Sequence, residues 1–123
     1  MAQSRDASSY EWVCFELLAY ELPDDDPSDV ERRIKRKLKR RKLGEYQPSR
    51  VDALRCLKNA LYTEIYVLCR RSRYYRGMTQ STVDYDDFDT TRMAKDFFRE
   101  FSTIPKVEIE RAISFAIYVY YLR

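Results

Sequence analysis

The chain has 123 residues, of which 45% are hydrophobic and 35% charged, so it can bury one modest core and is too apolar for a disordered chain. Its two glycines and four prolines leave few turns, which favours helices over a sandwich or barrel of short strands. The net charge of +3 is distributed unevenly, because residues 32–76 alone carry +13. A segment with so much positive charge creates a strong local field that needs a physical explanation.

Five helices are predicted, in one compact all-α domain over residues 1–123 with a flexible leader at 1–8. The first helix, over residues 8–22, begins at a capping box in which Ser8 and Glu11 each bond an amide of the other. Apolar side chains cover so much of its surface that we expect burial on more than one side.

The second helix, over residues 28–43, is the basic one. Ser28 and Glu31 offer another capping box, and Gly44 is the residue type that usually follows a helix. Its apolar side chains recur every four residues, as Val30, Ile34 and Leu38. So narrow a row can dock the helix at the edge of a bundle but cannot bury it.

The third helix is predicted to be the longest and to form the centre of the bundle. Ser49 is its expected N-cap, and neither Gly nor Pro interrupts the chain from there until Gly77. Its apolar stripe consists of Leu54, Leu57, Leu61, Ile65 and Leu68.

A polar loop at 77–87 precedes the fourth helix, which is expected to end near Ser102 and to direct Ala94, Phe97, Phe98 and Phe101 inward. Pro105 suits the first turn of the fifth helix. The expected core face of that helix consists of Ile109, Ile113, Ala116, Ile117 and Tyr120.

The basic helix is the main functional signal. Its nine cations repel one another, and like charges four residues apart destabilise a helix by a few tenths of a kcal/mol per pair. An ordinary solvated helix mixes its charges, whereas residues 32–44 contain no acidic residue. Phosphate backbones explain this pattern, because each neutralised phosphate releases condensed counterions. The candidate nucleic-acid-binding residues are Arg32, Arg33, Lys35, Arg36, Lys37, Lys39, Arg40, Arg41 and Lys42.

Two other interpretations of the basic helix remain open. The acidic stretch at 23–31 can fold back and neutralise the cations, as can acidic neighbours in an oligomer. Alternatively, the helix docks on an acidic protein surface. A transcription factor that reads base sequence fits less well, because residues 31–43 have no Asn or Gln to contact base edges.

A second candidate cluster combines cations with aromatic rings, as in proteins that stack the bases of single strands. Its members are Arg70, Arg71, Arg73, Tyr74, Tyr75 and Arg76. Cations near a helix C-terminus and tyrosines at a core edge explain the same residues without a ligand. If both clusters bind, the second and third helices are expected to present one continuous basic surface, because the connection between them is short.

The sequence argues against an enzyme. It has no histidine, the commonest general acid–base, and its two glycines cannot build a phosphate-binding loop. Acidic runs at 24–26 and 84–89 are interpreted as solvated loops with helix-capping aspartates in preference to Mg²⁺ ligands. We therefore expect no catalytic residues, metal, cofactor or small-molecule substrate.

The cysteines and the chain's ends indicate a cytoplasmic protein. Cys14, Cys56 and Cys69 are scattered and odd in number, which favours reduced thiols. The polar start of the chain does not have the pattern of a signal peptide. The apolar run at 112–122 is shorter than the ~20 residues of a membrane span, so no membrane is expected.

With about five helices, the basic stretch RRIKRKLKRRKL, the cluster RRSRYYR and no catalytic set, the chain resembles the small subunit of multi-subunit CRISPR effector complexes. In some subtypes, type I-D among them, that subunit is the C-terminal part of the large subunit, produced from an internal start. A polar leader after Met1 and a chain that ends on YVYYLR look like that arrangement.

The resemblance implies a non-catalytic subunit of a ribonucleoprotein in antiviral defence. Such a subunit packs against copies of itself and other effector subunits, and contacts a target or displaced DNA strand, or the guide RNA–DNA duplex, without reading sequence. The rival hypothesis is a helical adaptor or anti-defence protein whose basic helix docks on an acidic protein.

Overall fold

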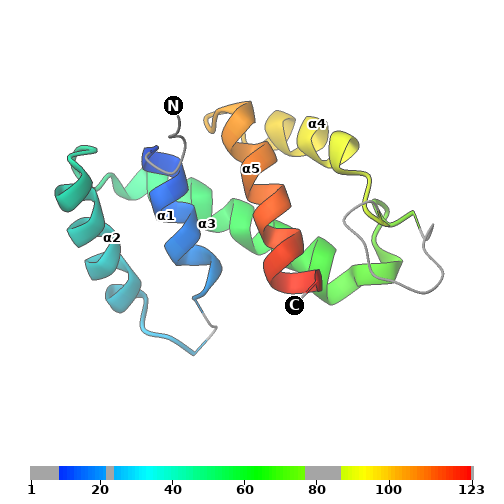
Figure 1. Ribbon diagram of the computed structural model, residues 1–123, viewed down its shortest axis with the longest axis horizontal. Coiled ribbons are helices and arrows are strands. Elements are labelled where there is room, and N and C mark those ends of the chain that lie inside the picture. Colours follow the sequence, from blue (N-terminus) through cyan, green and yellow to red (C-terminus); the bar gives the residue numbers. More distant parts are fainter. Residues whose placement is uncertain (1–8, 22–23, 77–86, 123) are drawn as a thin grey trace. The chain divides into compact units, whose positions relative to one another are not determined.

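The computed structural model describes residues 9–21, 24–76 and 87–122, which form α-helices and short π- and 3₁₀-helical turns and contain no β-strand (Figure 1). The predicted all-α class with five helices is confirmed. In chain order the elements are α1 (Tyr10–Ala19), α2 (Pro27–Arg41), α3 (Pro48–Tyr62), π-helical η2 (Thr63–Leu68), 3₁₀-helical η3 (Cys69–Arg71), α4 (Thr90–Glu100), α5 (Lys106–Ala116) and π-helical η5 (Ile117–Leu122). None of the described helices has both the length and the apolar content needed to cross a membrane.

The chain divides into two compact units, Met1–Arg55 and Cys56–Arg123. The first contains α1, α2 and the first half of α3, and the second contains the remaining elements. A single domain over the whole chain stays a prediction, and the predicted leader at 1–8 lies outside the described residues.

In the first unit α1 and α2 run antiparallel and pack against each other (Figure 1). Val13, Cys14 and Phe15 follow one another on α1, and each is at most 1% exposed. Consecutive helical residues point about 100° apart, so α1 is buried on more than one side, as expected. The predicted row on α2 is also confirmed, since Val30, Ile34 and Leu38 are its buried residues.

Three of the predicted helix starts are wrong by one or two residues. The N-cap of α1 is Ser9, whose Oγ accepts a bond from the Trp12 amide at 3.0 Å, so Ser8 does not cap this helix. Asp26 caps α2 in place of Ser28 and accepts a bond from the Ser28 amide at 3.0 Å. α2 and α3 both begin at a proline, which has no amide hydrogen to leave unbonded. For α3 this is Pro48, so Ser49 lies inside the helix.

The predicted third helix loses its α-helical geometry before its predicted end. After Tyr62 the chain continues through the π-helical η2 and the 3₁₀-helical η3, which ends at Arg71. Beyond it the backbone is extended at Ser72 and pairs with the segment before α4: the Arg76 amide donates to the Asp87 carbonyl at 2.7 Å. Residues 72–76 therefore form a connection and not a last helical turn.

The core of the second unit follows the predicted stripes except at Phe98 and Phe101 of α4 and at Leu68 and Tyr120, which are only half-buried. Leu61, Ile65 and the inward face of α5 from Ile109 to Ile117 are buried. On α4 the buried residues are Met93, Ala94 and Phe97, whereas Phe98 is 37% exposed and Phe101 only half-buried. Phe98 was assigned to the core wrongly, because its neighbour Phe97 already points inward and adjacent side chains diverge by about 100°.

Thiol labelling is expected to separate two of the cysteines. Burial, and next the charge of Glu11, raise the pKa of Cys14 to about 12, while Cys56 is exposed. Because the thiolate is the reactive form, maleimide at about pH 7.5 should modify Cys56 quickly and Cys14 only after unfolding. Peptide mass mapping locates the label, and a Cys56→Ser variant serves as the control. Rapid labelling of Cys14 in the folded protein would contradict this packing of α1.

Candidate nucleic-acid interface

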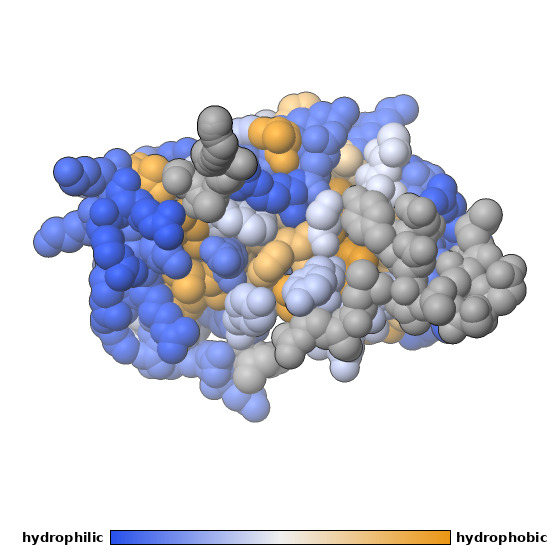
Figure 2. All heavy atoms as spheres, in the orientation of Figure 1, coloured by the Kyte–Doolittle hydropathy of each residue, from blue (hydrophilic) through white to orange (hydrophobic). Residues whose placement is uncertain are grey.

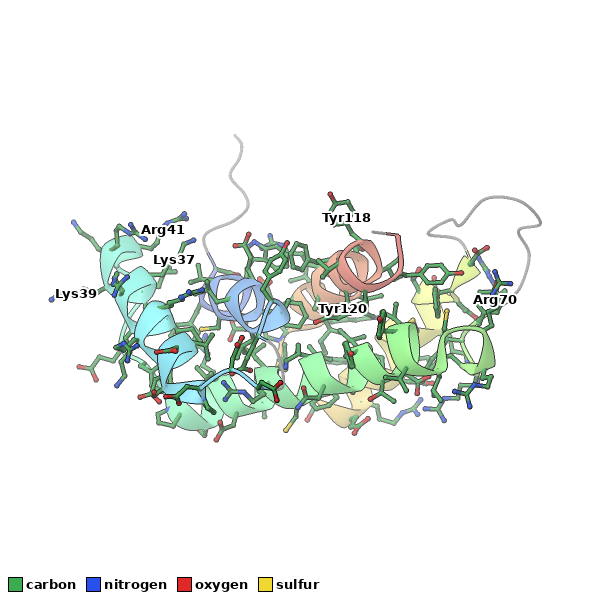
Figure 3. The ribbon with its side chains drawn as sticks, turned by 90° about the horizontal axis from the view of Figure 1, so that it is seen from below. Lys37, Lys39, Arg41, Arg70, Tyr118 and Tyr120 are labelled. Carbon is green, nitrogen blue, oxygen red and sulfur yellow. The ribbon has the colours of Figure 1, made fainter. Side chains whose placement is uncertain are left out.

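α2 carries all nine cations of the first predicted cluster, with Lys42 at its C-cap. Ile34 and Leu38, 0% and 1% exposed, anchor the inner side of this helix. Hydrophilic side chains cover the surface where α2 lies (Figure 2), and the labelled Lys39 extends away from the ribbon (Figure 3). The burial of three apolar residues thus leaves the rest of the helix surface to Lys and Arg.

The acidic start of α2 neutralises only part of this charge. Arg32 is paired with Asp29, and the Lys35 Nζ lies 2.9 Å from Glu31 Oε2. Within the described residues the other seven cations have no ion pair with a carboxylate: Arg33, Arg36, Lys37, Lys39, Arg40, Arg41 and Lys42. Three of them, Lys39, Arg40 and Arg41, lie in the last turn, where the helix dipole also favours positive charge.

The nine cations do not share one face. Arg36, Lys39 and Arg40 are exposed, and their spacing puts them on the side of α2 opposite Ile34. Lys37 is only half-exposed and lies on a flank of the apolar row. One extended polyanion can therefore follow the outer face of α2, while the flanking cations contribute mainly through their field.

The second cluster lies in the second unit, and its side chains make more contacts within the protein than the cations of α2 do. The Arg70 guanidinium lies 5.7 Å from the Tyr75 ring centroid, and that half-buried ring meets Phe88 edge-on at 5.6 Å. Arg71 and Arg73 are exposed, and Arg76 is exposed but has an interaction partner. Figure 3 shows Arg70 where the helical run from α3 through η3 ends.

The prediction that Tyr74 stacks on a base is wrong, because the ring is buried. Its side chain is 0% exposed and packs 5.9 Å from the Phe97 ring, so it offers no face to a base. The hydroxyl donates to Asp96 Oδ2 at 2.8 Å and accepts from Arg73 at 3.0 Å. Burial, and next the bond to Asp96, raise the pKa of Tyr74. This tyrosine is a core residue of the second unit.

The two clusters belong to different units, α2 to the first and residues 70–76 to the second. The continuous basic surface expected from both clusters therefore stays a prediction.

Sequence reasoning missed Tyr46, which lines a cavity beside the C-terminal half of α2. The loop that carries it is fixed by Tyr10, whose hydroxyl donates to the Glu45 carbonyl at 3.0 Å and accepts from the Gln47 amide at 2.8 Å. An aromatic residue soon after a basic helix was the available signal. These bonds join residues more than 30 positions apart, so no local pattern reveals them.

Aspartates of both acidic runs cap helices, but the second run is not a wholly solvated loop as expected. Asp87 is 1% exposed and its Oδ2 accepts a bond from the Tyr121 hydroxyl at 3.4 Å. Asp26 caps α2, and Asp89 caps α4 by accepting from the Arg92 amide at 3.1 Å, as expected for capping aspartates. Residues 84–86 of the second run lie outside the described part of the chain. In the part that is described, no three His, Cys, Asp or Glu residues gather in a way that could hold a metal ion.

The comparisons with family models, curated proteins and solved structures find no match to this chain. Its binding properties are therefore inferred from its own side chains, and the charge on the exposed surface of α2 is the feature with the clearest chemistry.

Proposed function

We propose that this chain is a non-catalytic nucleic-acid-binding protein whose helix α2 contacts the phosphate backbone without reading sequence. The supporting observation is the set of seven cations on α2 and its C-cap that have no carboxylate partner among the described residues. Mutual repulsion of these cations destabilises the helix, and a polyphosphate partner removes that cost.

The side chains of α2 fit backbone contact better than base recognition. Lys and Arg bind phosphate oxygens at any sequence, whereas the readout of adenine typically uses Asn or Gln. Residues 31–43 contain neither amide. Binding is therefore expected to be nearly equal for unrelated sequences and to fall steeply with salt.

We further propose that the chain works as a subunit of a larger ribonucleoprotein, as its resemblance to the small subunit of CRISPR effector complexes implies. In that setting α2 would lie along a target or displaced DNA strand, and other surfaces would contact copies of the chain and neighbouring subunits. Affinity purification from the native cell tests this role, since nucleic acid and effector proteins should copurify with the chain. Recovery of an acidic protein without nucleic acid would favour the adaptor hypothesis.

One observation favours contact with proteins as a second function. The second unit exposes Tyr66 and Tyr118 by 58% and 59%, and Tyr118 points away from the ribbon (Figure 3). Tyrosine is enriched at protein interfaces, because its ring buries much area and its hydroxyl still forms a hydrogen bond. A purely protein-binding adaptor would use these exposed tyrosines together with α2 and would not bind oligonucleotides at physiological salt.

Fluorescence polarisation with labelled oligonucleotides tests the main proposal. If about five phosphates are contacted, the slope of log affinity against log salt should be about −4 to −5 on double-stranded DNA. Two duplexes of unrelated sequence should give the same affinity within about threefold, since one mismatched contact in a specific site typically costs more than that. A flat salt response, or no binding at low salt, would exclude the proposed mechanism.

A further inference from the structure

A wide cavity of about 520 Å³, largely open to solvent, lies on the first unit beside the C-terminal half of α2. This volume is within the range of small-ligand sites, about 300–1,000 Å³. Its lining includes Leu38 and Tyr46, which are apolar or aromatic, and the three lysines Lys35, Lys39 and Lys42. Glu45 is the acidic residue of the lining, so the formal charge around the cavity is positive.

The aromatic wall of the cavity is held in place before any ligand arrives. Tyr46 is half-buried, and the Lys35 Nζ lies 5.3 Å from its ring centroid. That ammonium is also 2.9 Å from Glu31, so Lys35 contacts both the ring and a carboxylate at the exposed edge of the cavity. The loop on either side of Tyr46 is tied to α1 through the Tyr10 hydroxyl.

Lys42 has a left-handed backbone conformation that glycine adopts at lower cost than lysine. Its φ of 56° is left-handed, a conformation that costs a non-glycine residue about 1–2 kcal/mol. Glycine is the usual residue at this place in a helix end, and the Leu43 amide completes the turn by donating to the Leu38 carbonyl at 3.0 Å. A lysine here lowers the stability of the helix end and adds to the cavity an ammonium group that has no ion pair among the described residues.

We propose that this cavity binds one nucleotide of a single-stranded nucleic acid, with the base against Tyr46 and the adjoining phosphates on Lys39 and Lys42. The inference rests on the proposed function and specifies the form of nucleic acid that α2 prefers. Base faces are available in a single strand and hidden in a duplex, so an aromatic wall among lysines favours the single strand. DNA and RNA share this chemistry.

Variants of Tyr46 give the direct test. Tyr46→Leu should weaken binding of a mixed-sequence single-stranded 12-mer about tenfold, because base stacking on an aromatic ring is lost. Tyr46→Phe retains the ring and should bind within about twofold of the unchanged chain. Binding of a duplex of the same sequence should not change in either variant. DNA and RNA 12-mers are titrated separately by fluorescence polarisation, to show which sugar the cavity accepts.

Lys42→Gly separates the ligand role of this residue from its structural one. The variant should unfold at the same or a higher temperature, yet bind the single strand more weakly than Lys37→Gln, which removes one charge from α2 outside the cavity lining. If Tyr46→Leu and Lys42→Gly affect single strand and duplex equally, the nucleotide site is rejected while backbone binding by α2 stands. If the unchanged chain binds neither form, both proposals fail.

Discussion

Replacement of Arg36, Lys39 and Arg40 by glutamine should weaken binding to double-stranded DNA about 100-fold at ~0.1 M salt. All three are exposed on the outer face of α2 and have no ion pair among the described residues. Each lost phosphate contact lowers the salt slope by about 0.9, so the slope should fall by about 2.7. Fluorescence polarisation at several salt concentrations measures both quantities.

A control with the same change in net charge distinguishes the surface of α2 from a general charge effect. Lys95, Arg99 and Lys106 are exposed residues of α4 and α5, and their replacement by glutamine removes three positive charges from the second unit. This control should retain most of the affinity. Equal weakening by both triple variants would show that net charge, and not α2, determines binding. Circular dichroism should show that the α2 variant melts no earlier than the unchanged chain, because repulsion along the helix is reduced.

Tyr74→Ala should destabilise the second unit by about 3–5 kcal/mol, the usual cost of truncating a buried aromatic side chain. The ring is 0% exposed against Phe97, and its hydroxyl is bonded to Asp96. Truncation leaves a cavity and removes a hydrogen-bond donor from a half-buried carboxylate. Urea unfolding followed by circular dichroism measures the change in the free energy of unfolding.

Tyr74→Phe is the matched variant, because it retains the ring and removes only the hydroxyl. Its expected cost is about 1–2 kcal/mol, with oligonucleotide affinity unchanged. A folded, stable Tyr74→Ala protein that has lost affinity for single strands would overturn the core assignment. That result would restore the base-stacking role expected from the cluster of arginines and tyrosines.

Hydrophobic periodicity was the most reliable guide to the fold. The four-residue spacing of Val30, Ile34 and Leu38 predicted the buried side of α2, because a helix returns to the same face every three to four residues. Helix starts were harder to place, since several residues that suit an N-cap or a first helical position lie within two or three positions of one another. The choice depends on which amide the flanking backbone leaves unbonded.

Some of the candidate functional residues were also predictable from the local sequence, and others were not. The local sequence is enough to predict that the cations of α2 are exposed. A helix with only three apolar residues can bury one narrow row, so its charged side chains stay at the surface. For Tyr74 and Tyr46 the local sequence favours neither burial nor exposure. The Tyr74 ring packs against Phe97 and its hydroxyl bonds to Asp96, and the loop of Tyr46 is held by Tyr10.

The sequence by itself therefore determined the helical class, the inner side of α2 and the surplus of positive charge on its outer side. Only the tertiary structure decided which tyrosine enters the core and that a cavity forms beside Tyr46. The physical reason is the range of the interactions. Helix periodicity and charge repulsion act between residues a few positions apart, whereas the bonds that place these tyrosines join segments 22 to 37 residues apart.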